Sequence, residues 1–352
     1  MDLLHSWGVE LAVHLQGRYS KHEEFFTLAS TVADLHTTFF CLFPIWFHLR
    51  RDTGLRLIWV AVIGDWLNLV LKWVLSGERP YWWVHETQFY REGEAPPLLQ
   101  FPITCETGPG SPSGHAMGAA CVWYVMVTAV LSIAAEKRCP ALLYKLLQMG
   151  LWGLFVLVEL VVCMSRVFMA AHFPHQVVAG VVTGVLVAEV VSKSKWIYNA
   201  SMNQYFLITF CLTSFAIGFY LLLKTLGVDL LWTLDKAQKW CIKPEWIHLD
   251  STPFASLLRN MGSLFGLGVG LHSPIYNGVK KKNATTAFKI GSITISLFLL
   301  QLLDEWTFSS ENHLIFYILS FCKSAFALLI PTAVVPWVLC RIFMGKRDGK
   351  NL

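Results

Sequence analysis

Long apolar stretches separated by short polar segments dominate the pattern of this 352-residue chain. Nine of them approach ~20 residues, the length that an α-helix needs to cross a bilayer. They lie near residues 25–47, 57–77, 115–135, 145–165, 172–191, 205–224, 254–272, 287–306 and 314–340. A helix satisfies its own backbone hydrogen bonds in lipid. The pattern therefore predicts an all-α, polytopic membrane protein of about nine transmembrane helices.

Composition supports the membrane-protein class and limits the kinds of partner that the chain can bind. Only 14% of the residues are charged and 55% are apolar, whereas a soluble protein carries roughly 25% charged residues. The net charge of +5 comes from cations in separate short loops, which argues against nucleic acid and leaves the lipid bilayer as the main partner. No repeat or domain-sized linker interrupts residues 1–352, so we expect a single domain. Whether Cys105 and Cys241, which lie in polar loops, form a disulfide stays open.

Basic residues give the expected orientation in the membrane. They gather in alternate loops, near residues 50–56, 137–145, 193–195, 280–289 and 341–350. Positively charged loops stay in the cytosol, which places the C-terminus there as well. An odd number of spans puts the N-terminus on the opposite face. Arg79, His115 and His172 then all open on this non-cytosolic face.

Three short segments combine cations, a helix start and histidines. They are KWVLSGERP at residues 72–80, PSGH at 112–115 and SRVFMAAH at 165–172. A phosphate ester needs charge neutralisation on its non-bridging oxygens, a nucleophile and a proton for the leaving oxygen. The three segments supply all of these without a cluster of metal ligands. We therefore expect a phosphate site that uses no metal and no other cofactor.

The first segment places two cations at the end of a span. Lys72 and Arg79 stand seven residues apart, so on a continuous helix both would project from one face, two turns apart. Asp65 and Asn68 precede Lys72 on the same stripe. A lysine inside a span is costly unless it is paired or faces water. Alone, the two cations could equally be interfacial anchors, but the other segments favour phosphate binding.

The second and third segments supply the donors and the histidines. Ser113 is a good N-cap, and Gly114 lets an anion approach the backbone at a helix N-terminus. Alone, this segment would be a plain helix start. Arg166 and His172 flank the short loop between the fourth and fifth spans. A histidine at a membrane edge is more often structural, but the neighbouring arginine favours catalysis.

Other ionisable residues also lie inside spans. Asp34 and His36 fall in the first span and Glu159 in the fourth. Charges at such depth usually have a function. They fit equally well as partners of Lys72 or of the arginines, and both interpretations stay open.

The three segments match the signature K-x6-RP, PSGH, SR-x5-H. On them the chain resembles the phosphatidic-acid-phosphatase and vanadium-haloperoxidase superfamily, and more narrowly the glucose-6-phosphatase catalytic subunits. Long strings carry the narrower resemblance, among them GDWLNLVLKW, RPYWWV, CETGPGSPSGHAMG and AAHFPHQVVAG. It covers essentially the whole chain, with the motif-bearing core at about 57–191 and additional helices at 25–47 and 205–340.

The resemblance implies an endoplasmic-reticulum enzyme that hydrolyses glucose 6-phosphate on the luminal side, late in gluconeogenesis and glycogenolysis. By motif, His172 would be the nucleophile that becomes phosphohistidine. His115 would protonate the departing sugar oxygen and later activate water. Phosphate would be bound by the remaining motif residues, Lys72, Arg79, Ser113, Gly114 and Arg166. A glucose 6-phosphate transporter would be the functional partner.

One position departs from the superfamily pattern. An Asp usually stands four residues after the nucleophile, where this chain has Gln176. An amide oxygen can accept a hydrogen bond but cannot stabilise an imidazolium with a full charge. Another group must therefore help to orient His172.

Three alternatives remain at this point. A lipid phosphate phosphatase would use the same chemistry on a substrate that enters from the bilayer, and only the family-specific strings favour a sugar. An anion transporter would use the three cations, but it gives no reason for the two histidines and shows no inverted repeat. The paralogue is also open, since FPIWFHL and FPHQVVAG resemble the gluconeogenic form whereas CVWYVMVTA and HETQFY resemble the feeble islet-type form.

Overall fold

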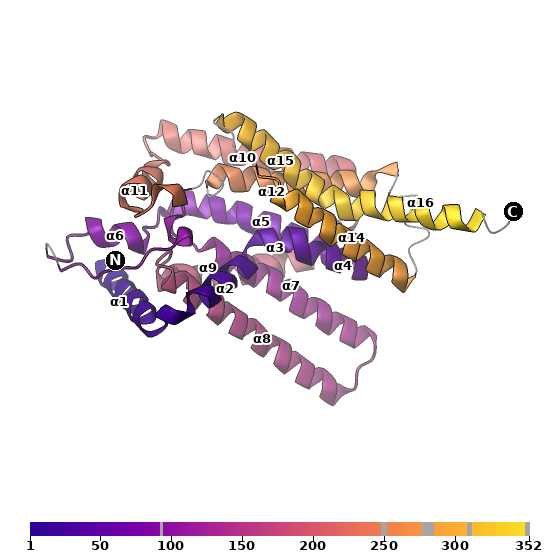
Figure 1. Cartoon of the computed structure of the whole chain (residues 1–352), viewed down its shortest axis with the longest axis horizontal. Coiled ribbons are helices and arrows are strands. Elements are labelled where there is room, and N and C mark those ends of the chain that lie inside the picture. Colours follow the sequence, from indigo (N-terminus) through magenta and orange to yellow (C-terminus); the bar gives the residue numbers. More distant parts are fainter. Residues whose placement is uncertain (92–93, 248–251, 275, 277–284, 308–311, 349–352) are drawn as a thin grey trace. The chain divides into compact units, whose positions relative to one another are not determined.

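Figure 1 shows the computed structural model of the chain. It describes residues 1–91, 94–247, 252–274, 276, 285–307 and 312–348, so the basic residues at 280–282 and Lys350 lie outside it. Every regular element in these ranges is a helix, which confirms the all-α class. The longer helices are α5 (Arg51–Leu75), α7 (Gly114–Glu136), α8 (Ala141–Phe168), α9 (Pro174–Lys193), α10 (Met202–Thr225), α12 (Pro253–His272), α14 (Thr286–Glu305) and α15 (His313–Leu329).

Shorter helices flank these long ones. They are α1 (Asp2–Arg18), α2 (Glu23–Ala33), α3 (Leu35–Thr37), α4 (Phe43–Leu49), α6 (Pro80–Glu86), α11 (Trp232–Trp240) and α16 (Val335–Asp348). The apolar pattern predicted neither α1 nor α11, because both are too short and too polar to cross a bilayer.

The number of spans is lower than expected within the described ranges. Seven helical segments are long and apolar enough to cross a membrane: Arg51–Glu86, Gly114–Glu136, Ala141–Phe168, Pro174–Lys193, Met202–Thr225, Thr286–Glu305 and Leu314–Ile342. The segment expected at 25–47 is interrupted at Asp34 and adds an eighth if its two halves form one span. The segment expected at 254–272 is helix α12, whose middle carries Arg259 and Asn260. The count of nine is therefore not confirmed.

The chain packs as two compact units. The first comprises Met1–Leu35, Ile63–Val190 and Ala216–Ser256, and the second His36–Val62, Val191–Phe215 and Leu257–Leu352. Every candidate site residue belongs to the first unit. That all 352 residues act as a single domain stays a prediction. In the second unit, α14, α15 and α16 run together (Figure 1).

The first unit is built around a hairpin of α7 and α8, which pack along one another (Figure 1). Only 17% of the most apolar window of α8 is buried inside the protein, so this helix faces mostly outward, as lipid-facing helices do. Helix α9 approaches α7 closely at Gly184. A Cβ atom there would lie 2.8 Å from the Cβ of Ala120 and would also strike the Met117 carbonyl. Small residues of this kind let membrane helices pack backbone to backbone.

Polar contacts anchor the segments at the motif-bearing end of this unit. In α1, the Gln16 amide donates to the carbonyls of Phe168 (2.7 Å) and Leu99 (3.0 Å). A disulfide joins Cys105 to Cys241, which answers the question that the sequence left open. Helix α11 packs against α6. The long polar segment after residue 78 is thus tied down at several points.

Substitution of Gly184 tests the close contact between α7 and α9. Gly184→Ala should lower the apparent melting temperature of the detergent-solubilised protein, because overpacking at a tight contact costs about 1–3 kcal/mol. The matched control is Gly153→Ala on α8, where an added Cβ meets nothing within 4 Å. This control should be neutral or stabilising, since alanine favours a helix over glycine by about 1 kcal/mol. Equal melting temperatures for the two variants would contradict this packing.

Candidate active site

The chain between Lys72 and Arg79 does not continue as one helix. Helix α5 ends at Leu75, and Ser76 follows with a positive φ of 44°. Arg79 has an extended backbone (φ −115°, ψ 150°), which is the conformation that a following proline favours. Pro80 begins α6 at a position where its missing N–H does no harm. Our expectation that these two cations share one helical face is therefore wrong, and a turn brings Arg79 to the site.

Arg79 is fully buried and is held by two backbone carbonyls, one in the loop before the second motif segment and one in the third segment. Its Nε donates to the Gly108 carbonyl at 2.9 Å and its Nη1 to the Ala171 carbonyl at 3.1 Å. Its Nη2 is also buried and has no hydrogen-bond partner among the described residues. One guanidinium thus links the first and third segments to the loop that precedes the second, and it keeps one N–H group without a partner among the described residues.

Arg166 enters from the last turn of α8 and is also fully buried. Its Nη1 lies 3.4 Å from the hydroxyl of Ser30 in α2. That hydroxyl in turn contacts the hydroxyl of Ser165 at 2.7 Å. Within the described part of the chain, the buried Nε of Arg166 has no hydrogen-bond partner. Contacts between α2 and α8 therefore fix the direction of this second guanidinium.

Ser113 occupies the N-cap position of α7, as expected, but its side chain makes no capping hydrogen bond. The hydroxyl is buried and without a partner among the described residues. The turn before the helix is held by Asn68, whose amide donates to the Pro112 carbonyl at 3.1 Å. Gly114 begins the helix next to Asn68, whose Oδ1 would lie 3.2 Å from an added Cβ. A free hydroxyl thus stands beside the unpaired N–H groups of a helix start.

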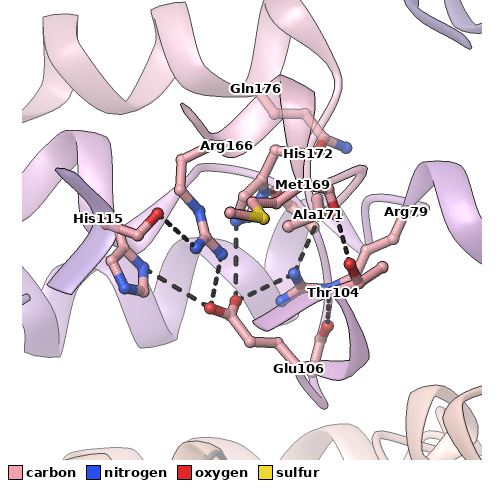
Figure 2. Close-up of polar contacts among 12 residues, drawn as sticks. Arg79, Thr104, Glu106, His115, Arg166, Met169, Ala171, His172 and Gln176 are labelled. Carbon is pink, nitrogen blue, oxygen red and sulfur yellow. Dashed lines mark hydrogen bonds and ion pairs between the residues drawn. The ribbon is translucent and has the colours of Figure 1, made fainter. Parts of the chain in front are cut away.

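The carboxylate of Glu106 lies between Arg79, Arg166, His115 and His172 (Figure 2). Its Oε1 is 2.6 Å from Arg166 Nη2 and 3.7 Å from His115 Nδ1. Its Oε2 is 3.1 Å from Arg79 Nη1 and 3.9 Å from His172 Nε2. Two arginines and two histidines therefore converge on one anion.

Sequence reasoning missed Glu106, although a signal for it exists. Glu106 is the only acidic residue in the turn-rich string between Cys105 and His115. Buried cations need a counter-charge. An acid inside a string that also carries the PSGH motif is the natural candidate for that role.

Electrostatics keeps Glu106 ionised and His172 neutral. Burial alone would raise the pKa of the Glu106 carboxyl, but the neighbouring cations, led by Arg166, lower it well below its ordinary value. Burial, followed by the positive charges of Arg79 and Arg166, holds the pKa of the His172 imidazole well below its ordinary value. A neutral imidazole keeps the lone pair that a nucleophile requires.

A backbone carbonyl orients His172. The ring Nδ1 lies 2.7 Å from the Gly110 carbonyl oxygen, which can only accept a hydrogen bond. Nδ1 therefore carries the proton, and the lone pair lies on Nε2. Nε2 is buried, has no hydrogen-bond partner among the residues described, and faces Glu106. The group that the sequence could not name is thus the main chain of the loop before Pro112.

Gln176 holds the three motif segments together. Among the described residues, none of its hydrogen bonds goes to the His172 imidazole. Its amide donates to the Glu78 carbonyl at 2.7 Å, and its Oε1 accepts from the Phe173 N–H at 3.1 Å. Its own carbonyl accepts from the Ser113 N–H at 3.1 Å. An added Cβ on Gly110 would lie 2.9 Å from Gln176 Oε1, so glycine permits this tight arrangement.

The structure brings four motif residues, Arg79, His115, Arg166 and His172, to the Glu106 carboxylate. The other three are Lys72, Ser113 and Gly114. Lys72 interacts electrostatically with Arg79, Glu106 and Arg166 from α5. Ser113 is joined to the group through Gln176, whereas Gly114 contacts Asn68. The nearby His175 points elsewhere, because it stacks with Phe173 and His5.

This arrangement is suited to binding and attacking a tetrahedral oxyanion. Three buried donors have no hydrogen-bond partner among the described residues: Arg79 Nη2, Arg166 Nε and the Ser113 hydroxyl. His172 Nε2 and His115 Nδ1 both face the position that the Glu106 carboxylate occupies. Among the described residues, no group of three or more His, Cys, Asp and Glu side chains is placed to hold a metal ion.

Sequence similarity to known proteins also indicates a phosphatase. Residues 53–200 match the model of the PAP2 superfamily. The chain is 76% identical over 352 residues, the full length of both chains, to Glucose-6-phosphatase catalytic subunit 1 of Haplochromis nubilus. It is 55% identical over 354 residues to the Canis lupus familiaris protein of that name, covering 100% of this chain and 99% of the relative.

A relative with a different name is less similar in sequence. The chain is 48% identical over 355 residues to human Glucose-6-phosphatase 2, again covering 100% of this chain and 99% of the relative. No solved structure matches the chain significantly. With full-length identities this high and a PAP2 domain over the motif-bearing residues, the chain belongs to the glucose-6-phosphatase catalytic subunit family and is a membrane-embedded phosphoric monoester hydrolase.

Proposed function

We propose that this chain hydrolyses glucose 6-phosphate to glucose and phosphate at the luminal face of the endoplasmic reticulum, through a phosphohistidine on His172. One observation carries the proposal. Two buried guanidiniums, His115 and His172 all converge on a single anion position, now filled by the Glu106 carboxylate. A phosphate group at that position would meet cations, a nucleophile and a proton donor together.

The first step forms a phosphoenzyme. The substrate phosphate takes the place of the Glu106 carboxylate, where Arg79, Arg166 and Lys72 neutralise its non-bridging oxygens. The Ser113 hydroxyl and the start of α7, at Gly114, add neutral donors. The His172 Nε2 lone pair attacks phosphorus as the bond from phosphorus to the sugar oxygen breaks. His115 gives its proton to that oxygen, so glucose leaves as a neutral alcohol.

The second step returns the enzyme to its starting state. His115, now neutral, takes a proton from water as the water oxygen attacks phosphorus. The phosphorus–nitrogen bond breaks and its electron pair returns to His172 Nε2. The Gly110 carbonyl holds the His172 ring in the same tautomer throughout.

The names of the relatives support glucose 6-phosphate as the substrate, and they favour one paralogue. Identity to the relatives named catalytic subunit 1 reaches 76%, against 48% for human Glucose-6-phosphatase 2. We therefore propose the gluconeogenic form, late in gluconeogenesis and glycogenolysis, with a glucose 6-phosphate transporter as its functional partner. Turnover of glucose 6-phosphate by the purified protein, compared with that of phosphatidic acid, tests the sugar against the lipid alternative.

The luminal position of the site rests on the distribution of basic loops and on the disulfide. Disulfides form in oxidising compartments such as the endoplasmic-reticulum lumen. Cys105, directly before Glu106, is paired with Cys241. The proposed orientation therefore places the N-terminus and the site in the lumen and the C-terminus in the cytosol.

Protease protection tests this orientation. A protease added to sealed microsomes should remove the basic C-terminal tail and spare the segment between Arg79 and Ser113, because only cytosolic segments are accessible. Permeabilised vesicles serve as the control, in which both regions are exposed to the protease. Cleavage of the 79–113 segment in sealed vesicles would place the site in the cytosol.

Trapping of the covalent intermediate tests the nucleophile. Labelled glucose 6-phosphate, quenched rapidly without acid, should leave phosphate on the protein in a form that acid removes, as expected for a phosphoramidate. His172→Ala should lose this label completely, whereas His175→Ala serves as the neighbouring histidine control and should keep it. Label that persists in the His172 variant would assign the nucleophile to another residue.

The leaving group tests the role of His115. A sugar alkoxide needs a proton to depart, a contribution of roughly 10²–10⁴-fold, whereas nitrophenolate leaves unaided. His115→Ala should therefore slow phosphorylation by glucose 6-phosphate far more than phosphorylation by p-nitrophenyl phosphate. The first step must be followed directly, because loss of the base would also slow the attack by water. Equal losses for both substrates would leave His115 as a phosphate ligand only.

A further inference from the structure

His115 stands between two carboxylates, one at each ring nitrogen. Its Nδ1 lies 3.7 Å from Glu106 Oε1, and its Nε2 lies 3.4 Å from Asp34 Oδ2. Since Glu106 occupies the anion position, Nδ1 is the nitrogen that faces the substrate and Nε2 is the nitrogen that faces away. We propose that Asp34 is the positioning residue that holds His115 for proton transfer, an assignment that rests on the function proposed above.

The chain around Asp34 is built to bring its carboxylate to this place. Helix α2 ends at Ala33, and Asp34 has an extended backbone (φ −67°, ψ 142°) whose N–H still donates to the Thr31 carbonyl. An acid that interrupts an apolar segment is costly and calls for a functional partner. The break turns the Asp34 carboxylate out of the helix, where it meets His115.

Apolar contacts on both sides of Asp34 fix its position on α7. Ala33 packs in one cluster with Ala119 of α7 and Val162 of α8. Leu35 lies against Gly118, where an added Cβ would be 3.1 Å from the Leu35 Cδ2 atom. Residue 118 is one turn beyond His115 on the same helix face. The three consecutive residues at 33–35 therefore dock on the His115 face of α7.

The contact explains how His115 can serve in both steps. A ring that donates from Nε2 to Asp34 carries its transferable proton on Nδ1, facing the sugar oxygen. After Nδ1 has given that proton away, Asp34 still holds the Nε2 proton. The lone pair then lies on Nδ1, where it can accept a proton from the attacking water. A carboxylate partner thus keeps the ring in one orientation and one tautomer.

The positioning role of Asp34 can be separated from any contribution that Asp34 makes to folding stability. The side chain of Asp34 is 46% exposed and that of His115 is 17% exposed. An ion pair with one half-exposed partner contributes little to folding. The isosteric change Asp34→Asn should therefore leave a folded protein, in which any loss of rate reports on the reaction itself.

The test measures the single-turnover rate of phosphorylation of the full-length protein with two substrates. Asp34→Asn should slow phosphorylation by glucose 6-phosphate by roughly 10-fold or more, below the 10²–10⁴-fold expected for loss of the acid itself. Phosphorylation by p-nitrophenyl phosphate should change little. Asp34→Glu should recover part of the rate. His36→Asn, two residues away and paired with Asp304 at 2.8 Å, is the matched control and should resemble the unmodified protein.

A double-mutant cycle identifies the residue through which Asp34 acts. Asp34 also interacts electrostatically with Arg166. If it works through His115, Asp34→Asn should cost nothing further in the His115→Ala background, since the two effects are coupled. A further loss in that background, or equal losses with both substrates, would overturn the assignment. Absence of label in the unmodified protein would overturn the proposed function, and with it this inference.

Discussion

The burial of two guanidiniums, Arg79 and Arg166, is the constraint on which the rest of the site depends. Both side chains have no solvent exposure, and an unpaired buried cation costs several kcal/mol. Each is therefore fixed by partners from another segment, carbonyls for Arg79 and the Ser30 hydroxyl for Arg166. The carbonyls and the hydroxyl are neutral, so the negative charge comes from the Glu106 carboxylate. Among the described residues, Arg79 Nη2 and Arg166 Nε remain without a hydrogen-bond partner, and we propose that an incoming phosphate uses them.

This constraint also explains why the motif segments lie at helix ends. A carbonyl in a helix interior already accepts from the N–H four residues later, so a loop carbonyl is the more available acceptor. The carbonyls that hold Arg79 and His172 come from Gly108, Gly110 and Ala171, all outside regular helices. Irregular backbone of this kind is unfavourable in lipid but not at the polar end of a bundle. The site therefore lies where the spans end.

The sequence predicted the arginines and histidines that meet, but neither Glu106 at their centre nor how they meet. Local patterns carry helix starts, so Ser113 at the N-cap was predictable. The turn after Leu75 was not, because the spacing between Lys72 and Arg79 also fits a helix. The partners of His172 could not be predicted either. A backbone carbonyl such as that of Gly110 leaves no signal in the side-chain sequence, and only folding brings it to the imidazole.

The replacement of an acid by Gln176 has an electrostatic consequence. Around the anion position, Lys72, Arg79 and Arg166 supply three cations, and Glu106 supplies the carboxylate on which the two arginines converge. Asp65 and Asp34 add negative charge, because Asp65 acts on Lys72 and Asp34 acts on Arg166. In the proposed mechanism these cations neutralise the phosphate monoester, which carries about two negative charges near neutral pH. A second carboxylate beside His172 would oppose that neutralisation and would favour a protonated, non-nucleophilic ring. Because the neutral Gly110 carbonyl orients the ring instead, the proposed nucleophile is held without a further negative charge beside the phosphate.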